Sequence, residues 1–176
     1  MWRVALALLL VCSACGARRV PTLAAFEVPL ATAADREEFL VLLSREAQAQ
    51  GFHVDASTPE ELEQLSPPFR KTIDAAVWRG NDDEAVAFIM DSHEALGRPS
   101  LVFSETGQPE RAAQFRESLM RKVRQRWPGT LSLPIMPTGG TPPQYQLKAT
   151  QEGYKLRPEY ASEYQISRDS HLVARE

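Results

Sequence analysis

The sequence predicts an α+β domain in which two helices pack on one face of a mostly antiparallel sheet. Two stretches with apolar residues at helical spacing, residues 33–50 and 109–127, are separated by short apolar segments with strand character. The order along the chain is helix, short strand, three strands, helix and strand. Helices and strands in this order favour an α+β fold. The topology that we expect is a ferredoxin-like arrangement.

The first helix is predicted from Ala33 to Gln50. Thr32 opens it with Asp35 three residues on, a capping-box pattern that has Asp in place of the usual Glu. Gly51 ends it. Its apolar positions fall on one face at helical spacing, and they are Phe39, Leu40, Leu43 and Ala47.

Strands follow this helix. Residues 52–55 predict a short strand, and residues 57–61 predict a brief helical turn. The strongest strand signals are residues 73–79 and 84–91, which the turn-forming residues 80–83 join as a hairpin. In the second of these strands, apolar side chains occupy both alternating sets of positions, so we expect it to be central and covered on both sides.

Another strand, a second helix and a final strand complete the pattern. Residues 100–104 predict a strand with apolar residues on both faces. The helix runs from Pro109, a residue suited to a first turn, to Trp127. Residues 131–136 predict a strand that Pro134 confines to an edge or a bulge, because proline cannot donate to the ladder. The helix has one apolar stripe, made of Ala112, Phe115, Leu119, Val123 and Trp127.

Residues 1–14 have the pattern of a signal that is removed after export. Arg3 supplies one positive charge, and residues 4–11 are an unbroken apolar run. A membrane-spanning helix needs about 20 apolar residues, whereas the apolar part of a secretory signal needs only about 7–15. The length of the run therefore favours a secretory signal.

The residues that follow, Cys12-Ser13-Ala14-Cys15-Gly16, resemble the lipobox of bacterial lipoproteins, in which a cysteine after two small residues carries the lipid. Cys15 is the matching cysteine. Cys12 stands where the lipobox usually has leucine, and a frame in which Cys12 is modified would put Val11 just before it, which fits less well. The alternative is an ordinary secretory signal that is cut at a small residue nearby.

This resemblance implies a bacterial lipoprotein precursor whose mature chain begins at Cys15. Two or three acyl chains on one cysteine, at about 0.8 kcal/mol per buried methylene, anchor a protein stably. Gly16 lacks the Asp that resembles a signal for retention in the inner membrane, which implies the outer membrane. We therefore expect the protein to be lipid-anchored in the bacterial cell envelope and to face the periplasm. Its first expected partner is the membrane itself.

The mature chain divides into three ranges. Residues 15–30 predict a lipidated tether, because arginines and prolines interrupt any regular pattern there. If residues 26–30 nevertheless pair with the sheet, the split βαβ pattern of a ferredoxin-like fold improves. Residues 31–137 form the α+β domain, and residues 138–176 form a polar C-terminal tail.

The tail has few aliphatic residues and is expected either to stay disordered until bound or to add marginal strands at residues 144–147 and 160–166. Its composition is compatible with a segment that contacts a partner. It is also compatible with a polar tail that has no specific role. It contains all the tyrosines of the chain, which are Tyr145, Tyr154, Tyr160 and Tyr164.

Composition limits what the domain can be. No cysteine follows Cys15, so disulfides and thiolate metal sites are excluded from the rest of the chain, which must depend on its core. About 160 mature residues are enough to bury one core, and we expect one compact domain. The formal net charge of −3 gives no electrostatic footprint for nucleic acid.

The sequence shows no catalytic, cofactor or metal motif. Residues 91–94, Asp-Ser-His-Glu, are the residue types of a hydrolase triad, but adjacent residues cannot converge as a triad requires. Residues 82–84, Asp-Asp-Glu, lack the glycine and the spacing of a calcium loop. The histidines do not stand at metal-ligand spacing, and they are His53, His93 and His171.

The second helix carries the most charged surface of the chain. Basic residues in its last turns complement the helix dipole, which explains several of them without any partner. The same residues would also suit anionic lipid head groups or lipopolysaccharide phosphates. They are Arg116, Arg121, Lys122, Arg124 and Arg126.

Two classes of function remain. The sequence favours a non-catalytic envelope lipoprotein whose domain binds another envelope protein, a glycan or a lipid through the tail or the basic helix. The alternative is an envelope hydrolase whose site is assembled from scattered polar residues such as His53, Asp91 and His93.

Overall fold

A computed structural model describes residues 22–56, 75–79, 84–90, 98–104, 107–136, 141–150 and 153–165. Its elements, in chain order, are β1 (Thr22–Glu27), α2 (Ala33–Ala49), β2 (Phe52–Ala56), β3 (Ala75–Arg79), β4 (Glu84–Met90), β5 (Ser100–Ser104), α4 (Pro109–Arg126), β6 (Leu131–Leu133), the short 3₁₀ helix η4 (Gln144–Gln146), β7 (Leu147–Thr150), β8 (Gly153–Leu156) and the 3₁₀ helix η5 (Pro158–Glu163).

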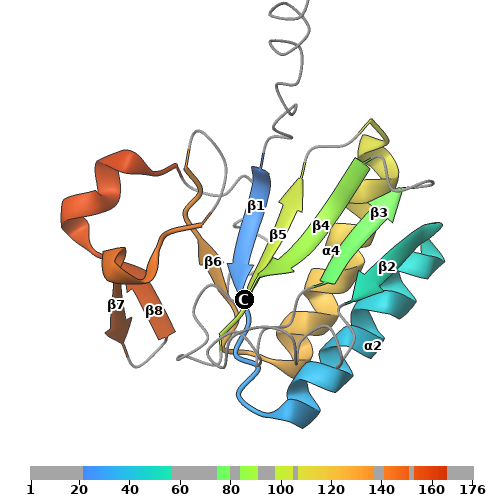
Figure 1. Cartoon of the computed structure of the whole chain (residues 1–176), viewed down its shortest axis with the longest axis horizontal. Coiled ribbons are helices and arrows are strands. Elements are labelled where there is room, and N and C mark those ends of the chain that lie inside the picture. The colour runs from blue at the N-terminus through green and yellow to red at the C-terminus, as the bar shows by residue number, and fades with distance from the viewer. Residues whose placement is uncertain are drawn as a thin grey trace, which may run out of the picture.

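Strands β1 to β6 form one sheet in the order β2-β3-β4-β5-β1-β6, and every neighbouring pair is antiparallel. Helices α2 and α4 lie beside each other against one face of this sheet (Figure 1). The β7–β8 hairpin stands beyond β6, at the side of the sheet away from β2. The predicted class, α+β with two helices on a mostly antiparallel sheet, is confirmed at this level.

Aromatic side chains fill the layer between the sheet and the helices. Phe26 of β1 meets Phe103 of β5 edge to face, with ring centroids 5.9 Å apart. Phe115 of α4 lies 6.0 Å from Phe103 and 5.8 Å from Phe52 of β2 in the same edge-to-face manner. All four rings are buried, and each such pair contributes about 0.5–1.5 kcal/mol beyond its buried area. This chain of rings connects the central strands, α4 and β2 in one core.

The opposite face of the sheet is also apolar near β1. Ala25 and Val102 are fully buried, and they alternate with residues of the main core because successive strand residues point to opposite faces. Leu133 and Ile135 complete a small second cluster with them. The predicted burial of residues 100–104 on both faces is therefore confirmed.

The start of α2 follows the predicted capping box. The Asp35 backbone N–H donates to Thr32 Oγ1 at 3.0 Å, and the Thr32 backbone N–H donates to Asp35 Oδ2 at 3.2 Å. At the other end, Gly51 has φ +76°, a left-handed conformation that favours glycine. Local sequence therefore determines both ends of this helix.

The predicted tether is wrong from Thr22 onward. Residues 22–27 form β1, which pairs with β5 on one side and with β6 on the other. Ala24 and Phe26 are fully buried, and β1 is an interior strand of the sheet, next to the edge strand β6. Pro29 does not interrupt the strand because it stands after it. Residues 15–21, including Cys15, lie outside the described residues.

Most of the described part of the tail has regular structure. Residues 144–147, predicted as a marginal strand, form η4 and the start of β7, and η5 runs through residues 158–163. Backbone hydrogen bonds of 3.0 and 2.8 Å join Ile135 and Gln165 and fix the tail to the segment that follows β6. β6 is an edge strand of the sheet, as Pro134 predicts. The predicted turns at residues 57–61 and 80–83 lie outside the described residues.

Candidate functional site

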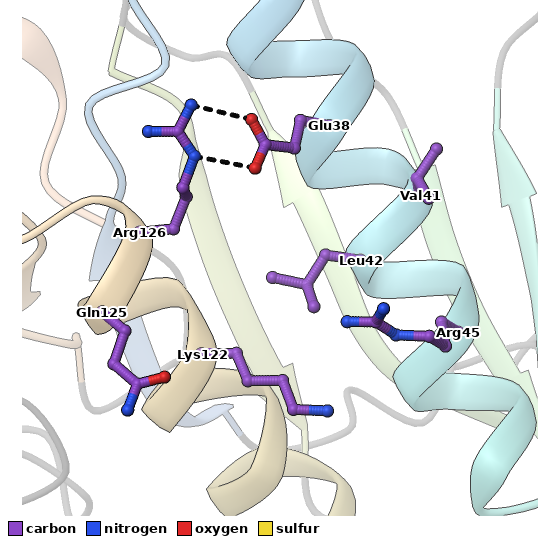
Figure 2. Close-up of a pocket in the computed structure, with 7 residues that line it drawn as sticks. All are labelled: Glu38, Val41, Leu42, Arg45, Lys122, Gln125 and Arg126. Carbon is purple, nitrogen blue, oxygen red and sulfur yellow. Dashed lines mark hydrogen bonds and ion pairs between the residues drawn. The ribbon is translucent and has the colours of Figure 1, made fainter.

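Helices α2 and α4 border an open groove with a volume of about 370 Å³, which we call the α2–α4 groove. Figure 2 shows that Leu42 and Arg45 of α2 and Lys122 of α4 extend into the space between the helices, whereas Val41 and Gln125 point away from it. Four of the lining side chains carry charge, and two are aliphatic. The lining residues are Glu38, Val41, Leu42, Arg45, Lys122, Gln125 and Arg126.

One end of the groove is bridged by a bidentate ion pair. Arg126 Nε donates to Glu38 Oε1 at 2.7 Å, and Arg126 Nη2 donates to Glu38 Oε2 at 2.8 Å (Figure 2). The hydrogen bonds from Arg126 lower the pKa of Glu38, and the same bonds raise the pKa of Arg126. Both side chains are exposed, so the contribution to stability is small, but the parallel geometry fixes where the two charges lie.

Trp127 reinforces this end. Its indole Nε1–H donates to Asp35 Oδ1 at 3.1 Å, and its ring lies 5.7 Å from that of Phe39. The hydrogen bond from Thr32 lowers the pKa of Asp35 most, and the hydrogen bond from Trp127 lowers it further. The guanidinium carbon of Arg126 lies 5.5 Å from the centroid of the Trp127 ring, within cation–π range. The capping box of α2 is thus linked directly to the end of α4.

A buried carboxylate links the two helices farther along. Glu46 is only 5% exposed, and it accepts hydrogen bonds from Lys122 Nζ and from Ser118 Oγ, each at 2.6 Å. Arg45 Nε donates to the same carboxylate at 3.3 Å. Burial raises the pKa of Glu46, but the bonds from Lys122 and Ser118 outweigh burial and leave the pKa below its usual value. The carboxylate is therefore charged at neutral pH.

An aliphatic surface lies between these polar contacts. Leu42 points toward α4 and is nearly buried, whereas Val41 is 63% exposed. With Tyr145, Val41 is one of the two large hydrophobic side chains that the described residues leave most exposed. The groove therefore combines one exposed apolar side chain with charges that are already held in place.

The five predicted basic residues do not form a single strip. Lys122 and Arg126 face α2 and take part in the ion pairs above. Arg116 and Arg124 are half-buried and Arg121 is exposed, and none of these three lines the groove. Burial lowers the pKa of Arg116.

Sequence reasoning missed the acidic partners on α2. Glu38 and Glu46 are eight residues apart and lie opposite a basic pair with a helical i,i+4 spacing on α4. Matching the two charge patterns would have required knowing that the helices are antiparallel neighbours, which the sequence alone does not give.

The tail tyrosines separate into different roles. The Tyr164 hydroxyl donates to Gln146 Oε1, and burial raises the pKa of Tyr164. Tyr145 is 65% exposed and lies edge to face with Tyr160 at 5.9 Å. The described tyrosines thus include one that holds the tail together and one that is open to solvent. The side chain of Tyr154 lies outside the described residues.

Of the three residues of the hydrolase alternative, the structure describes only His53. His53 is half-buried on β2, whereas Asp91 and His93 lie outside the described residues. Within the described ranges, no three His, Cys, Asp or Glu side chains gather to hold a metal ion. The groove is lined by one carboxylate, from Glu38, by three cationic side chains, by one amide and by two aliphatic side chains.

Comparison with protein families, with curated proteins and with solved structures finds no match to this chain. None of the helices in the described ranges is long and apolar enough to cross a membrane.

Proposed function

We propose that this chain is a lipid-anchored protein of the bacterial cell envelope whose α+β domain is a non-catalytic binding module. The anchor is a lipid on Cys15, and the expected location is the outer membrane, facing the periplasm. The apolar run of residues 4–11 and the lipobox-like residues 12–16 support this address. No contact among the described residues favours the hydrolase alternative.

The binding face is the α2–α4 groove, and its partner is another envelope protein. The observation that carries this proposal is the exposure of Val41 beside ion pairs whose geometry is already fixed. An exposed aliphatic side chain gains free energy when a partner covers it, and fixed charges give that partner an orientation at little further entropic cost. A protein segment with an apolar side chain flanked by charged ones fits this surface.

Site-specific photo-cross-linking tests the groove. The photoreactive residue p-benzoylphenylalanine replaces Val41 in the full chain expressed in cells, and Arg121, exposed on α4 but outside the groove, is the matched control position. We expect a discrete adduct from position 41 that is absent at position 121. Loss of the adduct when Arg126→Glu is added would show that the groove's charges take part. Equal adducts at both positions, or none, would contradict a partner in the groove.

The anchor has its own test. Wild type and Cys15→Ser are compared by intact mass and by partition between membrane and soluble fractions. We expect an acyl-sized mass increment and membrane association in wild type only. An unmodified, soluble wild-type protein would refute the lipid anchor and leave a freely secreted domain.

The sheet topology also supports a ferredoxin-like arrangement, which stays a prediction. β1 lies between β5 and β6, so β5, α4 and β6 form a crossover around β1, as in a split βαβ unit. β1, α2 and β2 form a second and wider crossover, because β3, β4 and β5 all lie between β1 and β2. The proposed fold is thus a ferredoxin-like arrangement enlarged by a hairpin.

A further inference from the structure

One end of the domain contains the start of β1, the start of α4 and the end of α2. Thr22, the first residue of β1, pairs with Ser104 at the end of β5, and α4 begins shortly after Ser104. The end of α2 lies here too, because a Cβ atom added to Gly51 would lie 3.7 Å from Arg111 Nη1. Figure 1 shows β1 and α4 both starting at this end of the sheet. We call it the Thr22 end.

The opposite end holds the last turn of α4. Glu27, the last residue of β1, accepts a hydrogen bond from Arg98, which also donates to the Gly129 carbonyl at 3.0 Å. Gly129 is the third residue after the end of α4, so the Glu38–Arg126 end of the groove lies near this end of the domain. α4 has 18 residues, and at about 1.5 Å per residue it separates the two ends by about 27 Å.

The chain between the proposed lipid and the sheet is short. Residues 16–22 reach at most about 25 Å when fully extended, and a flexible chain of that length spans about 15 Å on average. Turning the far end of α4 toward the bilayer would require the tether to run back along the whole length of the domain. Its average span is too short for that.

We infer that the anchored domain stands with its Thr22 end on the lipid surface and presents the Glu38–Arg126 end of the groove to the periplasm. This inference rests on the proposed lipid anchor at Cys15. The surface that meets the bilayer contains Gln50, Gly51, Gly107 and Arg111.

This orientation changes which basic residues are expected to contact the lipid head groups. Lys122 and Arg126, which the sequence offered as candidates for head-group contact, lie toward the far end of α4 and instead face partners that arrive from the periplasm. Arg111 at the Thr22 end takes their place at the head groups.

Spin labels on the lipidated protein test the orientation. Arg111→Cys and Gln125→Cys each introduce the one free thiol of the mature chain, both at exposed positions of α4 about 21 Å apart along the helix. The proteins are placed in phosphatidylethanolamine–phosphatidylglycerol vesicles that contain a nickel-chelating lipid, and nickel relaxation of each label is measured. We expect severalfold stronger relaxation at position 111 than at position 125.

A lengthened tether provides the control. Insertion of roughly 20 Gly and Ser residues after Gly16 frees the domain, and the difference between the two labels should largely disappear. If the original chain floats with the vesicles but both labels relax equally, or position 125 relaxes more, the orientation is wrong and the anchor stands. If the chain does not float with the vesicles, the anchor itself fails, and the orientation fails with it.

Discussion

The carboxylate of Glu27 accepts a hydrogen bond from the guanidinium of Arg98, which lies 71 residues later in the chain. Glu27 is fully buried at the end of β1. Arg98 lies just before β5 and also donates a hydrogen bond to the carbonyl of Gly129, which precedes β6. One ion pair therefore connects the ends of three strands. A buried carboxylate depends strongly on such compensation, because desolvation of a charge is costly.

Replacing Arg98 with methionine removes the positive charge beside the Glu27 carboxylate. We expect Arg98→Met to lower the free energy of unfolding by about 3–5 kcal/mol, the range for breaking a buried ion pair. Urea denaturation measures the loss. The double variant Glu27→Gln/Arg98→Met should recover part of it, because no charge then remains to be desolvated. Arg121→Met, at an exposed position, is the control and should change stability by less than about 0.5 kcal/mol. An effect of Arg98→Met no larger than this would contradict the role of the pair.

Stability should fall in acid as the carboxylates between the helices are protonated. Asp35, Glu38 and Glu46 all have a lowered pKa in the folded protein. A lowered folded pKa contributes stability that is complete above the unfolded value, about 3.9–4.3, and is lost as pH falls through the folded value. Urea midpoints measured from pH 7 down to about pH 3 should therefore decrease below about pH 4.3.

Glu46→Gln isolates the buried member of this group. At neutral pH the variant should be less stable by about 1–3 kcal/mol, because hydrogen bonds to a charged group contribute in that range. The difference from wild type should shrink as pH falls, since protonated Glu46 has lost the same charge. A difference that stays constant across the acid range would mean that the Lys122 contact does not depend on ionisation.

Tyr164 should ionise at a higher pH than is usual for a tyrosine. Burial raises its pKa, and a raised folded pKa in an acidic group means that the unfolded state releases its proton first. Stability should therefore decrease as pH rises above about 10, until the folded pKa is reached. Ultraviolet titration of the phenolates measures this, with Tyr164→Phe expected to remove the late component and Tyr160→Phe expected to keep it. A late component that persists in Tyr164→Phe would contradict the burial of Tyr164.

Thr32→Ala tests the first turn of α2. The substitution removes the side-chain oxygen that accepts from the Asp35 N–H, and loss of such a cap costs about 1 kcal/mol. Thr32→Ser keeps the oxygen and should retain most of the stability. Thermal unfolding of the three proteins compares them, and equal losses in both variants would assign the effect to the methyl group instead of the cap.

Local signals were sufficient for the helices. Thr32, Asp35 and Gly51 act within a few residues of one another, so the ends of α2 are readable from the sequence. The strand at residues 100–104 was equally readable, because Leu101, Val102 and Phe103 are apolar on both faces.

The features that the sequence did not predict depend on contacts between residues that are distant in the sequence. β1 resembled a tether because its burial comes from pairing Phe26 with Leu101 and Ser132, which local pattern does not reveal. The contacts between the two helices were missed for the same reason, since Glu46 meets Lys122 only when α4 lies opposite α2. The basic residues of α4 were found, but which of them face α2 was not.

The position of β1 between β5 and β6 affects when the sheet can be completed. Its partners on both sides come from the second half of the chain, and sheets built on such distant pairs form slowly. During synthesis β1 is made before either of the strands that pair with it. The part of the sheet around β1 is therefore completed only after β6, the last strand of that sheet, has been made.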